Sequence, residues 1–324
     1  MAKDKAVVGI DLGATKMLVG ALRGSRVLAT VKAKTDPAGG LRRFLDGISA
    51  AVEEVLSRAE IRPKQLAAVG VGCPGVIDYR KNRIRSSANI PFLINFPLAK
   101  RLERIFGTPT TVENDANMGL YGEQQFGAAA GYRHVAGFFM GTGIGGALIL
   151  DGTLYRGSSG AAGELGHLFI DPLGPGCGCG NRGCLEAAAG RLAIAAEAAA
   201  LACRGRADHL LSDAGSDLRK LKSGALARAV KAGDDELRQL LRRKAQLVGI
   251  GMANVVNTLD PECIVLGGGL MEAMPQLILP AAEQSMRGHA MPDIAEHVKV
   301  AAAELGDLAI VMGAAKWALD HAGS

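Results

Sequence analysis

The amino-acid sequence predicts an α/β fold that consists of two related halves. The chain has 324 residues, which suits two domains of roughly 150 residues each. Short apolar runs alternate with longer segments of helical spacing, as expected for mixed sheets covered by helices. Three short strands joined by glycine-containing turns are predicted at residues 6–34 and again at 135–156, about 128 residues further along. This repeat favours two halves with the same plan.

The first half begins with a meander of antiparallel strands over residues 6–34, because short β-prone runs are separated there by glycine and polar turn residues. Residues 41–59 have apolar side chains at helical spacing and predict a helix. A buried strand is expected at 66–72. The segment TPTTVEN at 108–114 predicts another strand, and Asp115 directly after it begins a helical stretch.

The second half repeats the meander and then becomes mostly helical. An alanine-rich helix is predicted from Glu186 to Ala202, and a second long helix from about Asp234 to Asn257. The remaining expected elements are a strand at 261–266, a helix at 270–287, a strand at 297–304 and a helix at 307–322.

The domain boundaries follow from this order of elements. We expect a smaller N-terminal α/β domain at 1–118 together with about 305–324, and a larger C-terminal α/β domain at 119–304. No linker rich in proline or serine separates them, so a packed hinge is expected around 115–135.

Composition and charge exclude several classes of protein. A hydrophobic fraction of 48% with 21% charged residues supports folded cores and excludes disorder. The net charge of +5 is spread along the chain without a long basic run, so no nucleic-acid or membrane-surface partner is expected. The longest uncharged run, 135–150, is too short and glycine-rich to cross a membrane. The N-terminal sequence MAKDKAVVGID does not resemble a signal peptide, so we expect a cytoplasmic protein.

Glycine is in excess, with 44 residues, and it gathers in turns that could hold phosphate. Glycines let successive backbone N–H groups point at one anion, although tight hairpin turns alone would also explain them. The first such turn combines Asp11, Gly13, Thr15 and Lys16, which adds a carboxylate suited to Mg²⁺, directly or through water, and a cation.

The second glycine turn lies between the first two strands of the repeated meander. Gly141, Gly143 and Gly146 match the dinucleotide-binding fingerprint, but a strand follows them instead of a helix, which excludes a Rossmann site. Gly141, Thr142 and Gly143 are therefore predicted to hold phosphate as a hairpin turn. A third run, Gly267, Gly268 and Gly269, removes side chains where a purine could lie against the backbone. Together these turns predict binding of a nucleoside triphosphate.

Four residues predict a metal site. His167, Cys177, Cys179 and Cys184 have the spacing H-x9-C-x-C-x4-C, and one imidazole with three thiolates suits a closed, structural zinc site. The other three cysteines lie in apolar surroundings and are expected to be buried: Cys73, Cys203 and Cys263.

Acidic and amide side chains near these motifs are candidates for binding a sugar. Glu164 and Glu186 flank the zinc motif, and carboxylates are good acceptors for sugar hydroxyls, although either alone could be a solvated surface acid. Asp115 follows a predicted strand, where it could accept a hydroxyl proton or simply cap the next helix. Asn89 is a weaker polar candidate.

Seven motifs resemble those of the ROK family of sugar kinases and sugar-responsive repressors, in the family's order and over nearly the whole chain. They are DLGATK at 11–16, CPGVID at 73–78, ENDAN at 113–117, MGTGIGG at 140–146, ELGH at 164–167, CGCGNRGCLE at 177–186 and PECIVLGGG at 261–269.

The resemblance implies an actin-like, ribonuclease-H-like two-domain sugar kinase fold, with ATP and sugar in the cleft between the halves. It implies that Asp115 is the general base and that Asp11 lies near Mg²⁺. The residues it implies as sugar ligands are Asn114, Glu164, His167 and Glu186, and His167 with the three clustered cysteines is implied to hold zinc. A homodimer or homotetramer is also implied.

We therefore expect an ATP-dependent hexokinase of carbohydrate metabolism, a glucokinase that makes glucose 6-phosphate. Asp115 would take the proton of the 6-hydroxyl while the glycine turns and Mg²⁺ neutralise the γ-phosphate. Kinases for N-acetylmannosamine, N-acetylglucosamine, fructose or allose are alternatives, and polyphosphate is an alternative donor. A sugar-sensing repressor would need a DNA-binding segment before the first phosphate turn, and only ten residues precede Asp11.

Overall fold

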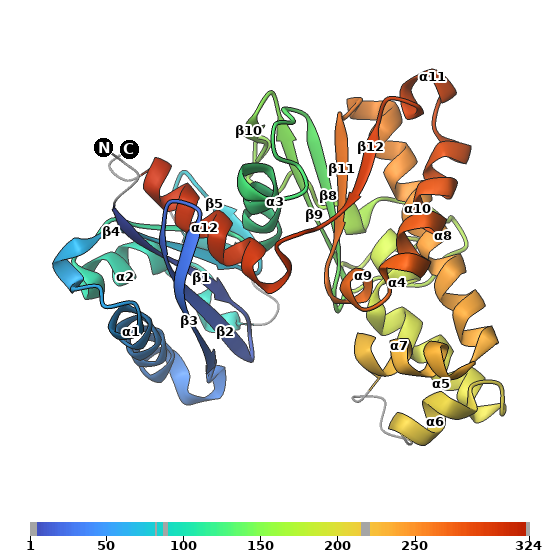
Figure 1. Cartoon of the computed structure of the whole chain (residues 1–324), viewed down its shortest axis with the longest axis horizontal. Coiled ribbons are helices and arrows are strands. Elements are labelled where there is room, and N and C mark those ends of the chain that lie inside the picture. Colours follow the sequence, from blue (N-terminus) through green and yellow to red (C-terminus); the bar gives the residue numbers. More distant parts are fainter. Residues whose placement is uncertain (1–4, 82, 87–89, 215–220, 322–324) are drawn as a thin grey trace. The chain divides into compact units, whose positions relative to one another are not determined.

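The computed structural model describes residues 5–81, 83–86, 90–214 and 221–321 (Figure 1). Asn89, a candidate sugar ligand, lies outside these residues. The chain divides into two compact units, the first formed by Met1–Gly131, Thr153–Ala162 and Asp307–Ser324, the second by Tyr132–Gly152 and Gly163–Gly306. The domain boundaries expected from the sequence stay a prediction; they differ from these units in the placement of 119–131 and 153–162.

The first unit contains a five-stranded sheet with the order β3-β2-β1-β4-β7. Strands β1, β2 and β3 pair antiparallel, whereas β1, β4 and β7 run parallel. The strands are β1 (Ala6–Leu12), β2 (Lys16–Arg23), β3 (Arg26–Lys34), β4 (Leu66–Cys73) and β7 (Thr110–Asn114), beside a small hairpin of β5 (Val76–Asp78) and β6 (Arg83–Ser86). The helices are α1 (Gly40–Arg58), α2 (Leu98–Phe106), α3 (Asp115–Phe126) and α12 (Ala309–Asp320).

The second sheet has the order β10-β9-β8-β11-β12, which places a meander beside two parallel strands as in the first sheet. Its strands are β8 (Val135–Met140), β9 (Ile144–Leu150), β10 (Thr153–Leu154), β11 (Cys263–Gly267) and β12 (Lys299–Ala302). The predicted repeat is thereby confirmed in the order of strands. The helices are α4 (Leu185–Ala189), α5 (Arg191–Cys203), α6 (Asp208–Ala214), α7 (Ser223–Ala232), α8 (Asp235–Leu259), α9 (Gly269–Ala273), α10 (Pro275–His289) and α11 (Pro292–Ala295).

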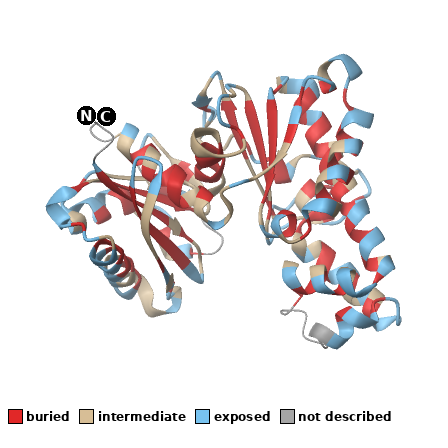
Figure 2. Cartoon of the chain, in the orientation of Figure 1, coloured by how far each residue is buried: buried red, intermediate tan, exposed pale blue. Residues whose placement is uncertain are grey.

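The core of the first unit shows how the alternation of side chains along a strand places helices on both faces of a sheet. Val8 and Ile10 of β1 are fully buried in a cluster with Ile48 of α1. Gly9 between them faces the other way, toward α12, where an added Cβ atom would lie 1.9 Å from the carbonyl oxygen of Val311. Glycine is therefore required there, because the helix backbone lies directly on the sheet. The central strands of both sheets are mostly buried, whereas the edge strand β3 and many helical positions are half-buried or exposed (Figure 2).

Two of the predicted helices were wrong in their continuity. The helix expected from Glu186 to Ala202 is two helices, because Gly190 between α4 and α5 adopts an extended conformation with ψ 158°. The helix expected at 270–287 is interrupted at Met274, whose φ of −145° suits the residue before a proline.

One cysteine also differs from expectation. Cys73 and Cys263 are buried as predicted, but Cys203 is exposed because it is the last residue of α5. Among the described helices, none combines the length and the apolar character that a membrane crossing requires.

Candidate active site

Three parallel strands of the first unit end at one edge of their sheet and bring acidic residues together. Asp11 of β1 pairs with Gly72 of β4, and Gly72 pairs with Glu113 of β7. Asp115, two residues after Glu113, is the first residue of α3. The carboxyl ends of parallel strands are where ligand-binding groups gather in α/β sheets, so this edge is a candidate site.

Asp115 does not cap helix α3. The N-cap is Asn114, whose side-chain oxygen accepts a hydrogen bond from the backbone N–H of Asn117 at 3.0 Å. The amide nitrogen of Asn114 donates to the carbonyl oxygen of Gly75 at 3.1 Å. Asp115 itself accepts a hydrogen bond from the N–H of Ala116 at 2.9 Å. The alternative that Asp115 is only a helix cap was therefore wrong, and its carboxylate is held at the start of the helix.

The two aspartates at this edge have unusual proton affinities. Burial raises the pKa of Asp115, against the lowering effect of backbone N–H groups and Asn114. The pKa of Asp11 is raised to about 7, first by burial and next by the negative charge of Asp115, while Lys16 acts in the opposite direction. Two carboxylates that repel each other are an arrangement that a bound cation stabilises.

The first glycine turn lies at the same edge, between β1 and β2. The N–H of Gly13 donates to the carbonyl oxygen of Lys16 at 3.0 Å, and a Cβ atom on Gly13 would lie 2.8 Å from that oxygen. Thr15 and Lys16 are exposed. The turn thus presents a hydroxyl and a cation to solvent, close to Asp11.

The second glycine turn lies in the second unit and is held by two helices. The hydroxyl of Thr142 accepts a hydrogen bond from the guanidinium of Arg191 at 2.9 Å, and its carbonyl oxygen accepts one from the N–H of Leu192 at 3.2 Å. Both donors belong to the first turn of α5. A helix N-terminus with a cation next to a glycine turn favours binding of an anion. Arg191 was missed in the sequence because it lies 49 residues from Thr142.

The same turn is tied to α4 by Glu186. The carboxylate of Glu186 accepts a hydrogen bond from the N–H of Ile144 at 2.9 Å. A Cβ atom on Gly143 would lie 1.9 Å from this carboxylate oxygen. Glu186 is therefore half-buried against the turn, which does not fit a solvated surface acid.

The third glycine run joins β11 to α9, since Gly267 is the last residue of β11 and Gly269 the first of α9. Gly268 has a φ of 87°, and a Cβ atom there would lie 2.7 Å from the carbonyl oxygen of Met140 at the end of β8. Close backbone packing therefore requires glycine at 268. The run Gly267 to Gly269 consequently lies beside the strand that leads into Gly141.

The predicted metal ligands lie together in the second unit. The ligand atoms of His167, Cys177, Cys179 and Cys184 are all within 4.8 Å of one another. The sulfur atoms of Cys179 and Cys184 are 3.7 Å apart, and that of Cys177 is 3.6 Å from Nδ1 of His167. Zinc–sulfur bonds of about 2.3 Å at tetrahedral angles separate two sulfur atoms by about 3.8 Å. The donor set and its spacing therefore fit a tetrahedral zinc ion.

Glycine turns shape this metal-binding loop. The N–H of Cys177 donates to the carbonyl oxygen of Asn181 at 2.7 Å, and the N–H of Gly180 donates to the carbonyl oxygen of Cys177 at 3.0 Å. Gly180 has a φ of 93°, which suits glycine in such a tight turn. Glu164 and His167, both exposed, lie at the two ends of a short 3-10 turn just before the loop. Of the candidate sugar ligands, Asn114 and Asp115 thus lie at the sheet edge of the first unit. Glu164, His167 and Glu186 lie around the metal-binding loop of the second unit.

Comparison with known proteins identifies the family. A model of the ROK family matches residues 7–321. The chain is 33% identical to a glucokinase of Thermotoga maritima over 95% of this chain and 96% of that protein. It is 28% identical to a xylose repressor of Caldicellulosiruptor bescii over 95% of this chain and 76% of that protein.

A solved structure agrees with these relatives. The crystal structure of a ROK family glucokinase from Streptomyces griseus in complex with glucose and AMPPNP superposes with a TM-score of 0.85 at 31% identity, covering 97% of this chain and 99% of that chain. The actin-like two-domain sugar kinase fold expected from the sequence is thereby confirmed. With the family model matched over nearly its whole length, the chain belongs to the ROK family.

Proposed function

We propose that this protein is a hexokinase that transfers the γ-phosphoryl group of ATP to the 6-hydroxyl of glucose. The carboxylate of Asp115 carries the proposal, because it directly follows β7 at the end of the parallel strands, its negative charge acts on Asp11, and burial raises its pKa. Glucokinase relatives of similar length and 31–33% identity support glucose as the acceptor.

Asp115 is proposed to act as the general base. The carboxylate of Asp115, held at the start of α3, would accept the proton of the sugar hydroxyl while the hydroxyl oxygen attacks the γ-phosphorus. The raised pKa of Asp115 makes this carboxylate a stronger base. Six residues are proposed as sugar ligands, because amide groups donate and accept hydrogen bonds with hydroxyls, ionised carboxylates accept them, and a zinc-bound imidazole donates from its second nitrogen. They are Asn89, Asn114, Asp115, Glu164, His167 and Glu186.

The glycine turns are proposed to bind the nucleotide. In the first unit Asp11, Gly13, Thr15 and Lys16 offer a carboxylate, a backbone turn and a cation. In the second unit the corresponding groups are Gly141, Thr142 and Gly143, supported by Arg191 and the start of α5. Gly267, Gly268 and Gly269 are proposed to lie against the base, with Gly268 half-buried and Gly269 exposed, whereas Gly267 is buried at the end of β11. Mg²⁺, held by Asp11 directly or through water, would neutralise charge on the transferred phosphoryl group.

Zinc is proposed as a structural ion. The four ligands His167, Cys177, Cys179 and Cys184 fill a tetrahedral set and leave no position for water, so the ion would support the loop rather than the chemistry. A metal bonded to Nδ1 of His167 leaves Nε2 for a sugar hydroxyl.

A coupled assay tests the proposal. Glucose, mannose, fructose, allose and N-acetylated hexosamines are compared with ATP as donor, and glucose is then compared with ATP and polyphosphate. We expect the highest kcat/KM for glucose with ATP. A higher value for another hexose would reassign the acceptor, and a higher value with polyphosphate would reassign the donor.

A sugar-sensing repressor is the second candidate, supported by the 28% identity to xylose repressors. Turnover of any hexose at rates typical of enzymes, about 1 per second or more, would exclude a purely regulatory role. We further propose that the protein is cytoplasmic and forms a homodimer or homotetramer. The mass in solution, measured by light scattering with analytical gel filtration, would test the number of chains.

A further inference from the structure

We propose that Glu113 and Arg156 form a positioning pair that fixes Asn114 and Asp115 in the geometry needed for proton transfer. Glu113 comes directly before these two residues, whereas Arg156 comes from the segment Thr153–Ala162 of the first unit. The inference rests on the proposed kinase function, because it assigns a role to Asp115 as the base.

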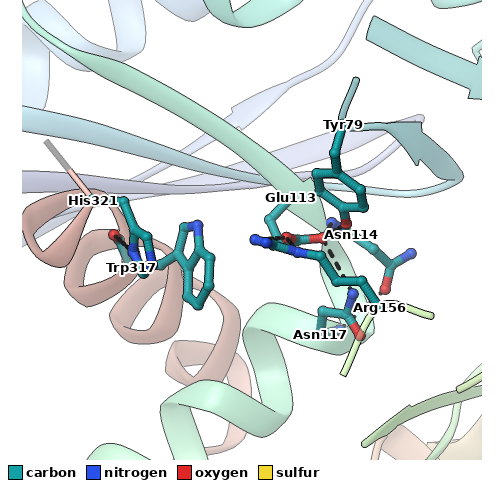
Figure 3. A network of polar contacts seen from close by, with 7 residues as sticks. All are labelled: Tyr79, Glu113, Asn114, Asn117, Arg156, Trp317 and His321. Carbon is teal, nitrogen blue, oxygen red and sulfur yellow. Dashed lines mark hydrogen bonds and ion pairs between the residues drawn. The ribbon is translucent and has the colours of Figure 1, made fainter. Parts of the chain in front are cut away.

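The carboxylate of Glu113 is the centre of a buried network (Figure 3). Only 1% of the Glu113 side chain is exposed, and both its oxygens accept hydrogen bonds. Oε2 accepts from Nε and Nη2 of Arg156 at 2.7 and 2.6 Å. Oε1 accepts from the hydroxyl of Tyr79, from the backbone N–H of Asn114 at 2.8 Å and from the side-chain amide of Asn117 at 3.1 Å. A buried carboxylate needs this many donors to compensate for its lost hydration.

Arg156 is itself fixed from both sides. Its guanidinium carbon lies 4.3 Å from the centre of the Tyr79 ring and 4.5 Å from the centre of the Trp317 ring. The Trp317 ring stacks on His321 with centroids 3.7 Å apart, so its position is also restrained (Figure 3). Two aromatic faces and a carboxylate leave the guanidinium little freedom, which makes it a rigid anchor for Glu113.

The bonds of Glu113 reach residues on both sides of Asp115. One holds the backbone of Asn114, and another holds the side chain of Asn117. Asn114 in turn bonds to the backbone N–H of Asn117 and to the carbonyl oxygen of Gly75. The peptide that carries Asp115 is therefore closed into a loop of hydrogen bonds that begins and ends at the Glu113 carboxylate.

Glu113 is a positioning residue, because its buried oxygens are already occupied by protein donors. Displacement of a catalytic group by about 1 Å can cost about a hundredfold in rate. Loss of the anchor should therefore lower kcat by about tenfold to a hundredfold. The KM for ATP should change by less than about twofold, since the phosphate turns bond to other residues.

The test compares four variants with the wild-type enzyme, using kcat per folded molecule, KM for ATP and Tm. Arg156→Met removes the anchor, Arg156→Lys keeps its charge without the fork of donors, and Tyr79→Phe removes one donor while keeping the ring. Arg287→Met is the matched control. Arg287 is partly exposed in the second unit and bonds to Glu283 at 2.7 Å and to the carbonyl oxygen of Val298 at 3.3 Å.

We expect a large loss of kcat in Arg156→Met, partial recovery in Arg156→Lys, a smaller loss in Tyr79→Phe, and a lowered Tm with unchanged kcat in Arg287→Met. If Arg156→Met fails to fold, Tyr79→Phe and Arg156→Lys decide. Wild-type kcat in every Arg156 and Tyr79 variant that folds would overturn the inference and leave the kinase function standing. A wild-type protein that phosphorylates no hexose would overturn the function and this inference with it.

Discussion

The carboxylate of Glu186 occupies the space that a side chain at position 143 would need. An added Cβ atom on Gly143 would lie 1.9 Å from the Glu186 oxygen, which at the same time accepts a hydrogen bond from Ile144. A helix that starts at the metal-binding loop is thus joined to a glycine turn proposed to bind phosphate.

Gly143→Ala should therefore weaken both the proposed binding of phosphate by the glycine turn and the proposed binding of sugar by Glu186. The methyl group would push Glu186 away from Ile144, so we expect kcat/KM for glucose and for ATP to fall by about tenfold or more. Steady-state kinetics measure this. Gly288→Ala is the control, because nothing lies within 4 Å of a Cβ atom there. Equal kinetics in both variants would contradict the assigned contact.

Asp115→Asn should abolish most turnover without loss of sugar binding. The amide keeps the shape and the acceptor for the N–H of Ala116 but cannot take a proton. A general base contributes about a hundredfold to ten-thousandfold, so kcat should fall by that factor while the Kd for glucose, from calorimetry, changes little. A kcat near that of the wild type would rule out Asp115 as the base.

The same variant should change stability in a pH-dependent way. Burial raises the pKa of Asp115 in the folded state above the ordinary value of about 3.9 that it has in the unfolded chain. Between these two pKa values the folded protein keeps a proton on Asp115 that the unfolded chain has released. The ionised carboxylate thus destabilises the fold as pH rises above the pKa of the unfolded chain. Without nucleotide and Mg²⁺, Asp115→Asn should have a higher Tm than the wild type at pH 8. Thermal unfolding at decreasing pH should show the difference shrink toward zero near pH 4; a constant difference would be the contrary result.

Removal of zinc should weaken structure and sugar binding together. We expect about one zinc per chain by elemental analysis, because the four ligands form one cluster. Cys179→Ser, or a strong chelator, should lower both the Tm and the affinity for glucose. Cys203→Ser is the matched control, since Cys203 is exposed at the end of α5 and outside the cluster. Unchanged Tm and affinity after complete loss of zinc would refute a structural ion.

The two strand meanders and the metal-binding residues were accessible from the sequence because their signals are local, whereas the pairing of distant strands such as β1 and β4 was not. His167 and the cysteines lie within one short segment, so their spacing alone brings the ligands together. The helix break at Met274 also has a local signal in Pro275, because a residue before proline disfavours helical backbone. Arg156 was not accessible, since its partner Glu113 lies 43 residues away and a lone arginine in a loop has no distinctive pattern.

The packing of α12 determines when the first unit can fold during synthesis. Gly9 and Gly70 of the sheet receive the backbone of α12, with added Cβ atoms 1.9 and 1.8 Å from the carbonyl oxygens of Val311 and Ala314. On the ribosome these strands emerge early, yet their covering helix follows only after residues 127–308 have been made. The second unit, complete by then, can fold first. Until α12 has been synthesised, the face of the first sheet that contains Gly9 and Gly70 therefore stays uncovered and accessible to chaperones and proteases.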